Sequence, residues 1–173
     1  MKLFKVAVST SIGWLTLTST DSALTEISFG KKINQIYHSN EILRQAELEL
    51  RQYLNGERTS FQVPYTLSST EFRTKTWNSL CRIPYGELAT YGEIAESIHQ
   101  PTAARAVGRA CNENPLPLVI PCHRVVGHSG NITGYAGGLE IKTKLIELER
   151  NNLIPSPKEM TPSRPFPHPL EDS

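Results

Sequence analysis

Hydrophobic and polar residues alternate near the start of the chain in a way that predicts two paired strands. Leu15 and Leu17 alternate with polar residues, a polar run at 19–22 interrupts the pattern, and Ile27 and Phe29 resume it. Alternation at every second position is typical of strands buried on one face, and the polar break is typical of a turn. The sequence therefore predicts a β-hairpin here.

A helical pattern follows this hairpin in the stretch "NEILRQAELELRQYLNGER". Leu43, Ala46 and Leu50 recur three or four residues apart, which places them on one face of a helix. Asn40 suits the N-cap of that helix and Gly56 suits its C-cap. We expect a single amphipathic helix packed on the hairpin.

The pattern then changes to short helices. The stretch at 61–67 is crossed by a proline, so we expect a linker or an edge strand there. Ser68 and Glu71 have the spacing of a capping box, and Thr90 and Glu93 repeat that spacing. Each pair predicts the start of a helix.

A third short helix is predicted for "TAARAVGRACNEN". Arg105 and Arg109 are four residues apart and share one side of it. The other side carries small apolar residues, namely Ala103, Ala106, Val107 and Ala110. Two short helices with a basic second helix are compatible with a helix-turn-helix, but an ordinary αα-hairpin produces the same pattern and is favoured by this pattern alone.

The last helix is predicted for "GGLEIKTKLIELER", with Ile141, Leu145 and Leu148 facing inward. The stretch 155–173 contains six prolines and almost no apolar periodicity, which is typical of a disordered tail. These patterns divide the chain into an N-terminal domain with its linker, a C-terminal domain and a tail, at 1–67, 68–154 and 155–173.

Charge and cysteine content narrow the classes of function. Eighteen basic and seventeen acidic residues leave a formal charge of +1, so any binding to DNA must come from a local patch. The cysteines Cys81, Cys111 and Cys122 are too few and too scattered for a disulfide framework, and they fit a reducing compartment. We expect Cys81 and Cys111 to be core thiols.

The chain carries no evident targeting or membrane segment. Its first apolar run is interrupted by polar residues at 9–11 without a clean cleavage site, and no run approaches the ~20 apolar residues that cross a bilayer. We expect an intracellular protein.

Cys122 carries the most informative local chemistry. It ends a run bracketed by prolines, "NPLPLVIPCHRVVG", and directly precedes His123. The thiol could be inert in the core, a metal ligand, or a nucleophile that the imidazole activates. Neighbours in an extended segment point to opposite sides, so adjacency alone favours an inert thiol. The cysteines have no C-x₂₋₄-C pair, which disfavours a metal site.

Four stretches, in this order and spacing, resemble the O6-alkylguanine-DNA alkyltransferase family: "IPYGELATYGEIA", "TAARAVGRA", "NPLPLVIPCHRVVG" and "GYAGGLEIKTKLIELE". The resemblance is strong over about residues 70–150 and weak through the N-terminal hairpin. It implies an α+β fold, with a small ribonuclease H-like domain of sheet and helix, then a mostly helical, winged-helix-like domain containing a helix-turn-helix. The second domain would bind DNA and transfer the alkyl group.

The resemblance also implies a reaction. The family repairs DNA by direct, irreversible and stoichiometric transfer of a methyl or alkyl group from O6-alkylguanine to a cysteine. A monomer acting on double-stranded DNA is expected, in the cytoplasm or, in a eukaryote, the nucleus. No cofactor is expected. The N-terminal zinc of some members is not expected either, because residues 1–80 contain no cysteine.

The catalytic roles of the family fall on five matching positions. Cys122 would accept the alkyl group, His123 would activate it through a bound water, and Glu149 would orient that histidine. We expect the imidazole to keep the sulfur ionised. Asn114 would brace the turns around Cys122, and Tyr91 would donate a proton toward the departing guanine.

Further positions match the family's contacts with DNA and with the extruded base. Arg105 would enter the duplex where the base has left, and Ala136 stands where several members carry a serine near the guanine O6. The remaining DNA-facing positions are Ala103, Ala104, Ala106, Gly108 and Arg109. The expected walls of the base pocket are Pro117, Val125 and Tyr135, together with Ala136.

Three other functions compete with repair. An alkyltransferase-like protein that binds lesions without repairing them would lack the acceptor cysteine, usually replaced by tryptophan, whereas Cys122 is present. A helix-turn-helix regulator would leave the pairing of Cys122 with His123 unexplained. A cysteine hydrolase would need an oxyanion hole, for which the sequence provides no sign.

Overall fold

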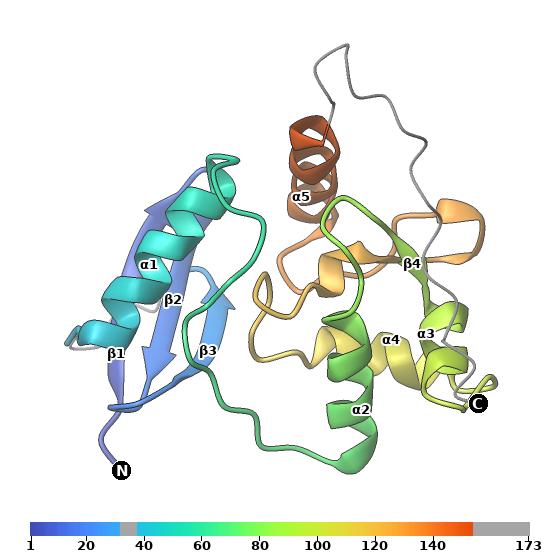
Figure 1. Ribbon diagram of the computed structural model, residues 1–173, viewed down its shortest axis with the longest axis horizontal. Coiled ribbons are helices and arrows are strands. Elements are labelled where there is room, and N and C mark those ends of the chain that lie inside the picture. The colour runs from blue at the N-terminus through green and yellow to red at the C-terminus, as the bar shows by residue number, and fades with distance from the viewer. Residues whose placement is uncertain (32–37, 154–173) are drawn as a thin grey trace. The chain divides into compact units, whose positions relative to one another are not determined.

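The computed structural model describes residues 1–31 and 38–153 and divides the chain into two compact units (Figure 1). The first unit is Met1–Ser69 together with Pro115–Val119, and the second is Thr70–Asn114 together with the chain from Ile120 onward. The return of Pro115–Val119 to the first unit was not predicted. The proline-rich stretch 155–173 lies outside the described residues.

The first unit contains an antiparallel sheet of β1 (Phe4–Thr10), β2 (Gly13–Ser19) and β3 (Leu24–Phe29), in that order. The predicted hairpin is confirmed as β2 and β3, because Leu15 pairs with Phe29 and Leu17 with Ile27. Strand β1 was not predicted. It pairs with β2 along its whole length and buries Val8 against the core.

Helix α1 (Glu41–Leu54) contacts all three strands. The predicted N-cap is confirmed, since the Asn40 side chain accepts the N–H of Leu43 at 2.9 Å. The helix ends at its C-cap Asn55, one residue before the glycine expected there. Gly56 follows with a φ of +77°, a left-handed conformation that glycine adopts without strain.

The stretch at 61–67 lies along the sheet without forming a regular strand. The N–H of Leu24 donates to the Pro64 carbonyl at 2.8 Å, and the N–H of Thr66 donates to the Leu24 carbonyl at 3.1 Å. The buried carboxylate of Glu49 accepts the N–H of Val63 at 3.0 Å. These contacts fix the stretch at the edge of β3 before the chain enters the second unit.

The second unit is mostly helical. Its elements are α2 (Glu71–Leu80), β4 (Ala89–Thr90), α3 (Tyr91–Ser97), α4 (Ala104–Asn112), the 3₁₀ turn η1 (Cys122–Arg124), β5 (Val125–Val126), the 3₁₀ turn η2 (His128–Gly130) and α5 (Leu139–Asn152). Helices α2, α3 and α4 pack on one another. The Trp77 indole N–H donates to the Ala110 carbonyl at 2.9 Å and links α2 to α4.

One of the two predicted capping boxes is present. Thr90 and Glu93 form a complete box at the start of α3. The Ser68 box is wrong, because Thr70 caps α2 and accepts the N–H of Arg73. Helix α2 buries Trp77 and Leu80 in the core.

The buried face of α5 differs from the predicted one. Leu145 is buried as expected, whereas Ile141 and Leu148 are only half-buried. Lys142 and Glu149 are fully buried on this face instead. Hydrophobic periodicity does not reveal charged side chains that find polar partners in the interior. No helix of the described part of the chain is both long and apolar enough to cross a membrane.

Candidate active site

A two-residue parallel ladder positions the Cys122 turn within the second unit. Ala89 of β4 pairs with Val125 of β5, and Thr90 pairs with Val126. The turn η1 leads into β5, so it lies beside the segment that leads into β4. At the other end of the ladder, α3 begins directly after β4.

The thiol of Cys122 lies in the interior, with 4% of the residue exposed. The Cys122 N–H and the Asn114 side-chain amide both donate to the Ile120 carbonyl, at 2.8 and 2.9 Å. Burial raises the pKa of the Cys122 thiol to about 11, although a hydrogen bond from Asn114 and the charge of Lys142 act in the opposite direction. Burial therefore favours a protonated thiol in the free protein, in contrast to the ionised sulfur that we expected beside the imidazole.

His123 and Glu149 form a buried pair. The imidazole Nε2 lies 2.9 Å from Glu149 Oε1, and both side chains are almost fully buried. Burial lowers the pKa of His123, and the neighbouring carboxylate opposes this shift only in part. Burial alone would raise the pKa of Glu149, but its contacts with His123 and Arg124 outweigh that effect and lower it to about 2. An ionised carboxylate accepts a hydrogen bond, so the neutral imidazole carries its proton on Nε2, which leaves Nδ1 as the basic nitrogen.

Arg124 belongs to the same network, and the sequence assigned it no role. Its Nη2 donates to Glu149 Oε1 at 2.8 Å, and its Nε donates to Oε2 at 3.0 Å. Its Nη1 donates to the Ile83 carbonyl at 2.7 Å. The backbone N–H of Gly86 donates to Oε2 at 3.2 Å. The carboxylate is thus held by four groups of three residues, which come from two segments of the chain.

Lys142 is a second buried cation that the sequence did not indicate. Its Nζ donates to the Thr133 carbonyl at 2.6 Å and to the Gly134 carbonyl at 3.2 Å. It lies 5.8 Å from the centroid of the Tyr91 ring. Its charge lowers the pKa of Cys122 against the effect of burial. The lysine therefore stabilises the loop before α5 and favours a thiolate. A lysine in the middle of a helix otherwise resembles a solvated charge, so no sequence signal distinguished it.

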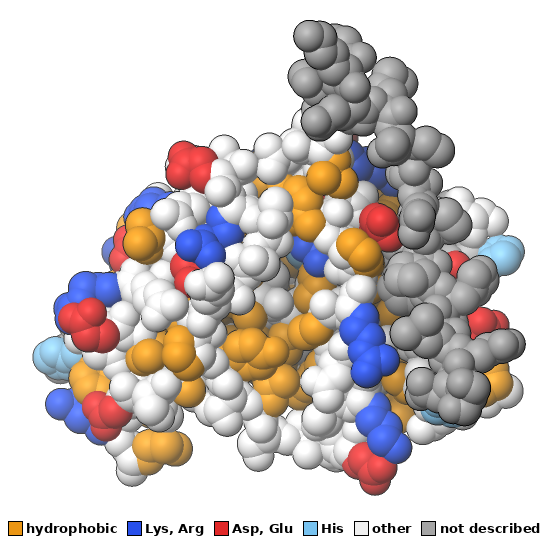
Figure 2. Space-filling model, in the orientation of Figure 1, with side chains coloured by type: hydrophobic (Ala, Val, Ile, Leu, Met, Phe, Trp, Pro, Cys, Tyr) orange, Lys and Arg blue, Asp and Glu red, His pale blue; other side chains and the backbone are white. Residues whose placement is uncertain are grey.

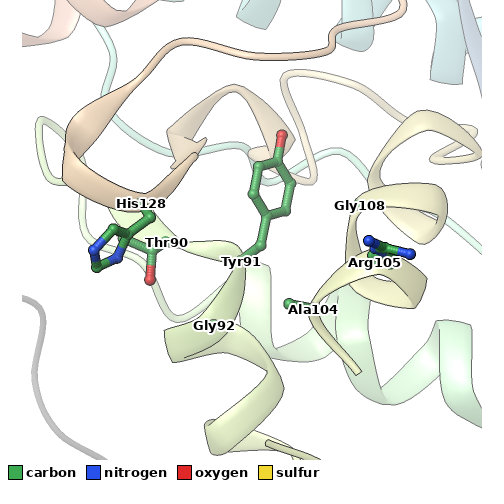
Figure 3. A pocket seen from close by; sticks show the side chains of 7 residues that line it. All are labelled: Thr90, Tyr91, Gly92, Ala104, Arg105, Gly108 and His128. Carbon is green, nitrogen blue, oxygen red and sulfur yellow. The ribbon is translucent and has the colours of Figure 1, made fainter. Parts of the chain in front are cut away.

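Tyr91 stands at a pocket of about 460 Å³ (Figure 3). Its ring rises between Thr90 and His128 on one side and helix α4 on the other. The lining residues are Thr90, Tyr91, Gly92, Ala104, Arg105, Gly108 and His128. The Tyr91 hydroxyl donates to the Thr133 carbonyl at 3.2 Å, and burial raises its pKa, so the phenol keeps its proton. The pocket combines a phenol proton donor with a cation and small residues.

The structure brings some predicted site residues together and leaves others apart. Arg105 and Arg109 are exposed on α4, while Ala103 and Ala106 are half-buried. Ala104 and Gly108 line the Tyr91 pocket together with Arg105. These positions form the accessible surface of α4.

The predicted walls of a base pocket do not line this cavity. Val125 is fully buried in β5, Tyr135 is half-buried and Ala136 is exposed. Pro117 lies in the segment that belongs to the first unit. Cys81 is exposed at the C-cap of α2, so its prediction as a core thiol is wrong, whereas Cys111 is buried as expected.

Basic and acidic side chains of the described residues lie interspersed on the face shown in Figure 2. This distribution agrees with the formal charge of +1. Attraction to a polyanion would therefore depend on local cations such as Arg105 and Arg109.

Comparisons with known proteins find the same family in both halves of the chain. The family model described as 6-O-methylguanine DNA methyltransferase, ribonuclease-like domain, matches residues 4–67, and the DNA binding domain of the same description matches residues 71–151. A protein of Methanosarcina barkeri named methylated-DNA–protein-cysteine methyltransferase is 43% identical over 152 residues, which cover 84% of this chain and 96% of that protein.

A relative of the same name from Mycolicibacterium paratuberculosis is 42% identical over 162 residues, covering 89% of this chain and 94% of that protein. The crystal structure of Mycobacterium tuberculosis OGT in complex with DNA matches with a TM-score of 0.78 and 40% identity, covering 84% of this chain and 92% of that chain. The expected α+β fold, with a small sheet domain followed by a helical domain, is confirmed.

Proposed function

The chain belongs to the 6-O-methylguanine DNA methyltransferase family, and from this premise we propose that it repairs DNA by transferring a methyl or larger alkyl group from the O6 atom of guanine to the thiol of Cys122. The names of its relatives and the DNA complex of the Mycobacterium tuberculosis protein support this activity. The pairing of His123 with Glu149 beside a buried thiol is the observation that carries the assignment to Cys122.

The reaction is a displacement at the alkyl carbon. The bond between that carbon and O6 breaks, and a bond between the carbon and sulfur forms. His123 takes the thiol proton through a water at Nδ1, and the departing guanine receives a proton in exchange. The thioether has no ready route back to a thiol, so each chain acts once and no cofactor is consumed.

The energetic requirement falls on the transfer of that proton. Burial raises the pKa of the Cys122 thiol to about 11 and lowers the pKa of His123, so the transfer of the proton from the thiol to the imidazole is uphill. Asn114 and Lys142 lower the requirement by stabilising the thiolate.

Binding to DNA is proposed for the exposed side of α4. The damaged base must leave the helical stack, which costs a few kcal/mol. Arg105 fills the gap and offsets part of that cost. The small residues Ala103, Ala104, Ala106 and Gly108 permit close approach to the minor groove, whose degenerate pattern suits an enzyme that seeks a lesion. Arg109 adds a contact with phosphate.

The extruded base is proposed to pack against Tyr135 of the second unit, whereas Val125 is fully buried and Pro117 belongs to the first unit. Tyr91, whose phenol keeps its proton, donates toward the departing guanine. Ala136 cannot supply a hydroxyl to O6, so recognition of the lesion depends on the other groups. Reduced cysteines and the DNA substrate support a location in the cytoplasm, or in the nucleus of a eukaryote.

The test compares three proteins on duplex DNA carrying an O6-methylguanine with a labelled methyl group. The parent should take up the label, and Cys122→Ala should take up none while binding the same DNA with an affinity within about threefold. Cys81→Ala is the matched control, because this thiol is exposed and lies outside the site, and it should transfer as the parent does. Transfer by Cys122→Ala, or binding without transfer by the parent, would refute the proposal.

A further inference from the structure

Arg124 is a buried cation that takes no direct part in the proposed displacement. Its side chain is 9% exposed, and that of its partner Glu149 is 2% exposed. A charge is taken into the interior of a protein only with compensation, and a functional network is one reason to keep it there.

The Arg124 guanidinium binds the Glu149 carboxylate side-on, through Nε and Nη2. Nη2 lies 2.8 Å from Oε1 and Nε lies 3.0 Å from Oε2, while Nη1 is anchored on the Ile83 carbonyl at 2.7 Å. The Tyr85 ring lies against the guanidinium with its centroid 5.6 Å away, and the Asn152 amide donates to the Tyr85 hydroxyl at 3.2 Å. These contacts hold the Arg124 side chain in one orientation. Its planar guanidinium binds both oxygens of the Glu149 carboxylate and so fixes the orientation of the carboxylate as well.

Oε1 of Glu149 is shared between Arg124 and the imidazole. It accepts from Arg124 Nη2 at 2.8 Å and lies 2.9 Å from His123 Nε2. A buried carboxylate without a cation would draw a solvent proton onto the imidazole. An imidazolium has no lone pair on Nδ1, so it could not receive the proton of the thiol.

We propose that Arg124 is a positioning residue of the alkyl transfer, which holds the Glu149 carboxylate against Nε2 of His123 and balances its charge, so that the imidazole stays neutral until it accepts the thiol proton. This inference rests on the proposed function. The titratable and charged groups around His123 are Cys122, Arg124, Lys142 and Glu149. Tyr85 and Tyr135 lie near the Glu149 carboxylate.

The test is the pH dependence of the single-turnover rate in the parent, Arg124→Gln and Arg124→Lys. The glutamine removes the charge, so the acid limb of the profile should move upward by about one to two pH units. Arg124→Lys keeps the positive charge but loses the planar guanidinium that binds both carboxylate oxygens. The acid limb of its pH–rate profile should therefore stay within about half a pH unit of the parent's, while its rate falls by about tenfold. Arg150→Gln is the matched control. It removes the same charge from the exposed side of α5 and should leave the profile unchanged.

If Arg124 had a purely structural role, Arg124→Gln would lower the fraction of active protein without moving the acid limb of the pH–rate profile. That result in a folded Arg124→Gln protein would overturn the proposal. Should this variant not fold, Arg124→Lys with the parent's rate would overturn it instead. Nitrogen NMR of the parent at neutral pH should find a neutral His123 protonated on Nε2, and an imidazolium would contradict the inference. Failure of the proposed function would look different, because the parent itself would then not alkylate Cys122.

Discussion

Burial shields the Cys122 thiol from solvent in the free protein. Cys122 is 4% exposed, and burial raises the pKa of its thiol to about 11, so the thiol keeps its proton at neutral pH. A protein that can react only once benefits from a nucleophile that does not react with other electrophiles. Under the proposed reaction, ionisation of Cys122 would follow the arrival of the extruded base.

This protection predicts the reactivity of Cys122 in the absence of DNA. In Cys81→Ala, which removes the exposed thiol, alkylation by iodoacetamide at neutral pH should be about a hundredfold slower than for a free cysteine. Because the thiolate is the nucleophile, the rate should rise about tenfold per pH unit toward pH 11. Mass spectrometry of the modified peptide measures it, and a fast rate independent of pH would show that the sulfur is ionised at rest.

The sequence allowed the acceptor and its partners to be proposed, but not their charges. The resemblance to the family, and not the local pattern, predicted that His123 and Glu149 meet, and the two side chains lie 2.9 Å apart. Arg124 and Lys142 were missed. Both are cations whose burial depends on carbonyl and carboxylate partners distant in the chain, and no local pattern encodes such partners.

Elements with strong local signals were predicted well, and elements that exist only through pairing were not. The Asn40 cap and the box of Thr90 with Glu93 satisfy donors at helix ends within three residues, so sequence spacing reveals them. Strands β4 and β5 have two residues each and form only because the ladder joins them. They nevertheless determine where the Cys122 turn and α3 lie.

Arg105 on helix α4 is proposed to fill the gap that an extruded base leaves in the duplex. Arg105→Ala should reduce the repair rate on duplex DNA by about tenfold, because an extruded base leaves a gap that alanine cannot fill. On single-stranded DNA no partner base or stack must be replaced, so the difference should shrink to about twofold. Arg82→Ala removes an exposed arginine outside the pocket and serves as the control. An equal loss on both substrates would contradict a role in extrusion.

At the scale of the whole molecule, the chain passes between its two units close to the acceptor. Pro115–Val119 belongs to the first unit, where the N–H of Ile27 donates to the Pro115 carbonyl at 2.8 Å, while Asn114 and Ile120 on either side belong to the second. Hydrophobic periodicity treats this stretch as one apolar run and cannot assign it to a unit. The near-neutral charge was predictable from composition, and it leaves recognition to local features of α4.

The proposed repair reaction is tested most directly by a titration of the whole protein with excess DNA containing O6-methylguanine, followed by peptide mapping of the methyl group. Uptake should stop at one methyl per chain, and every methyl should lie on the sulfur of Cys122. Uptake that continues beyond one equivalent, or a methyl on any other residue, would contradict the proposed reaction.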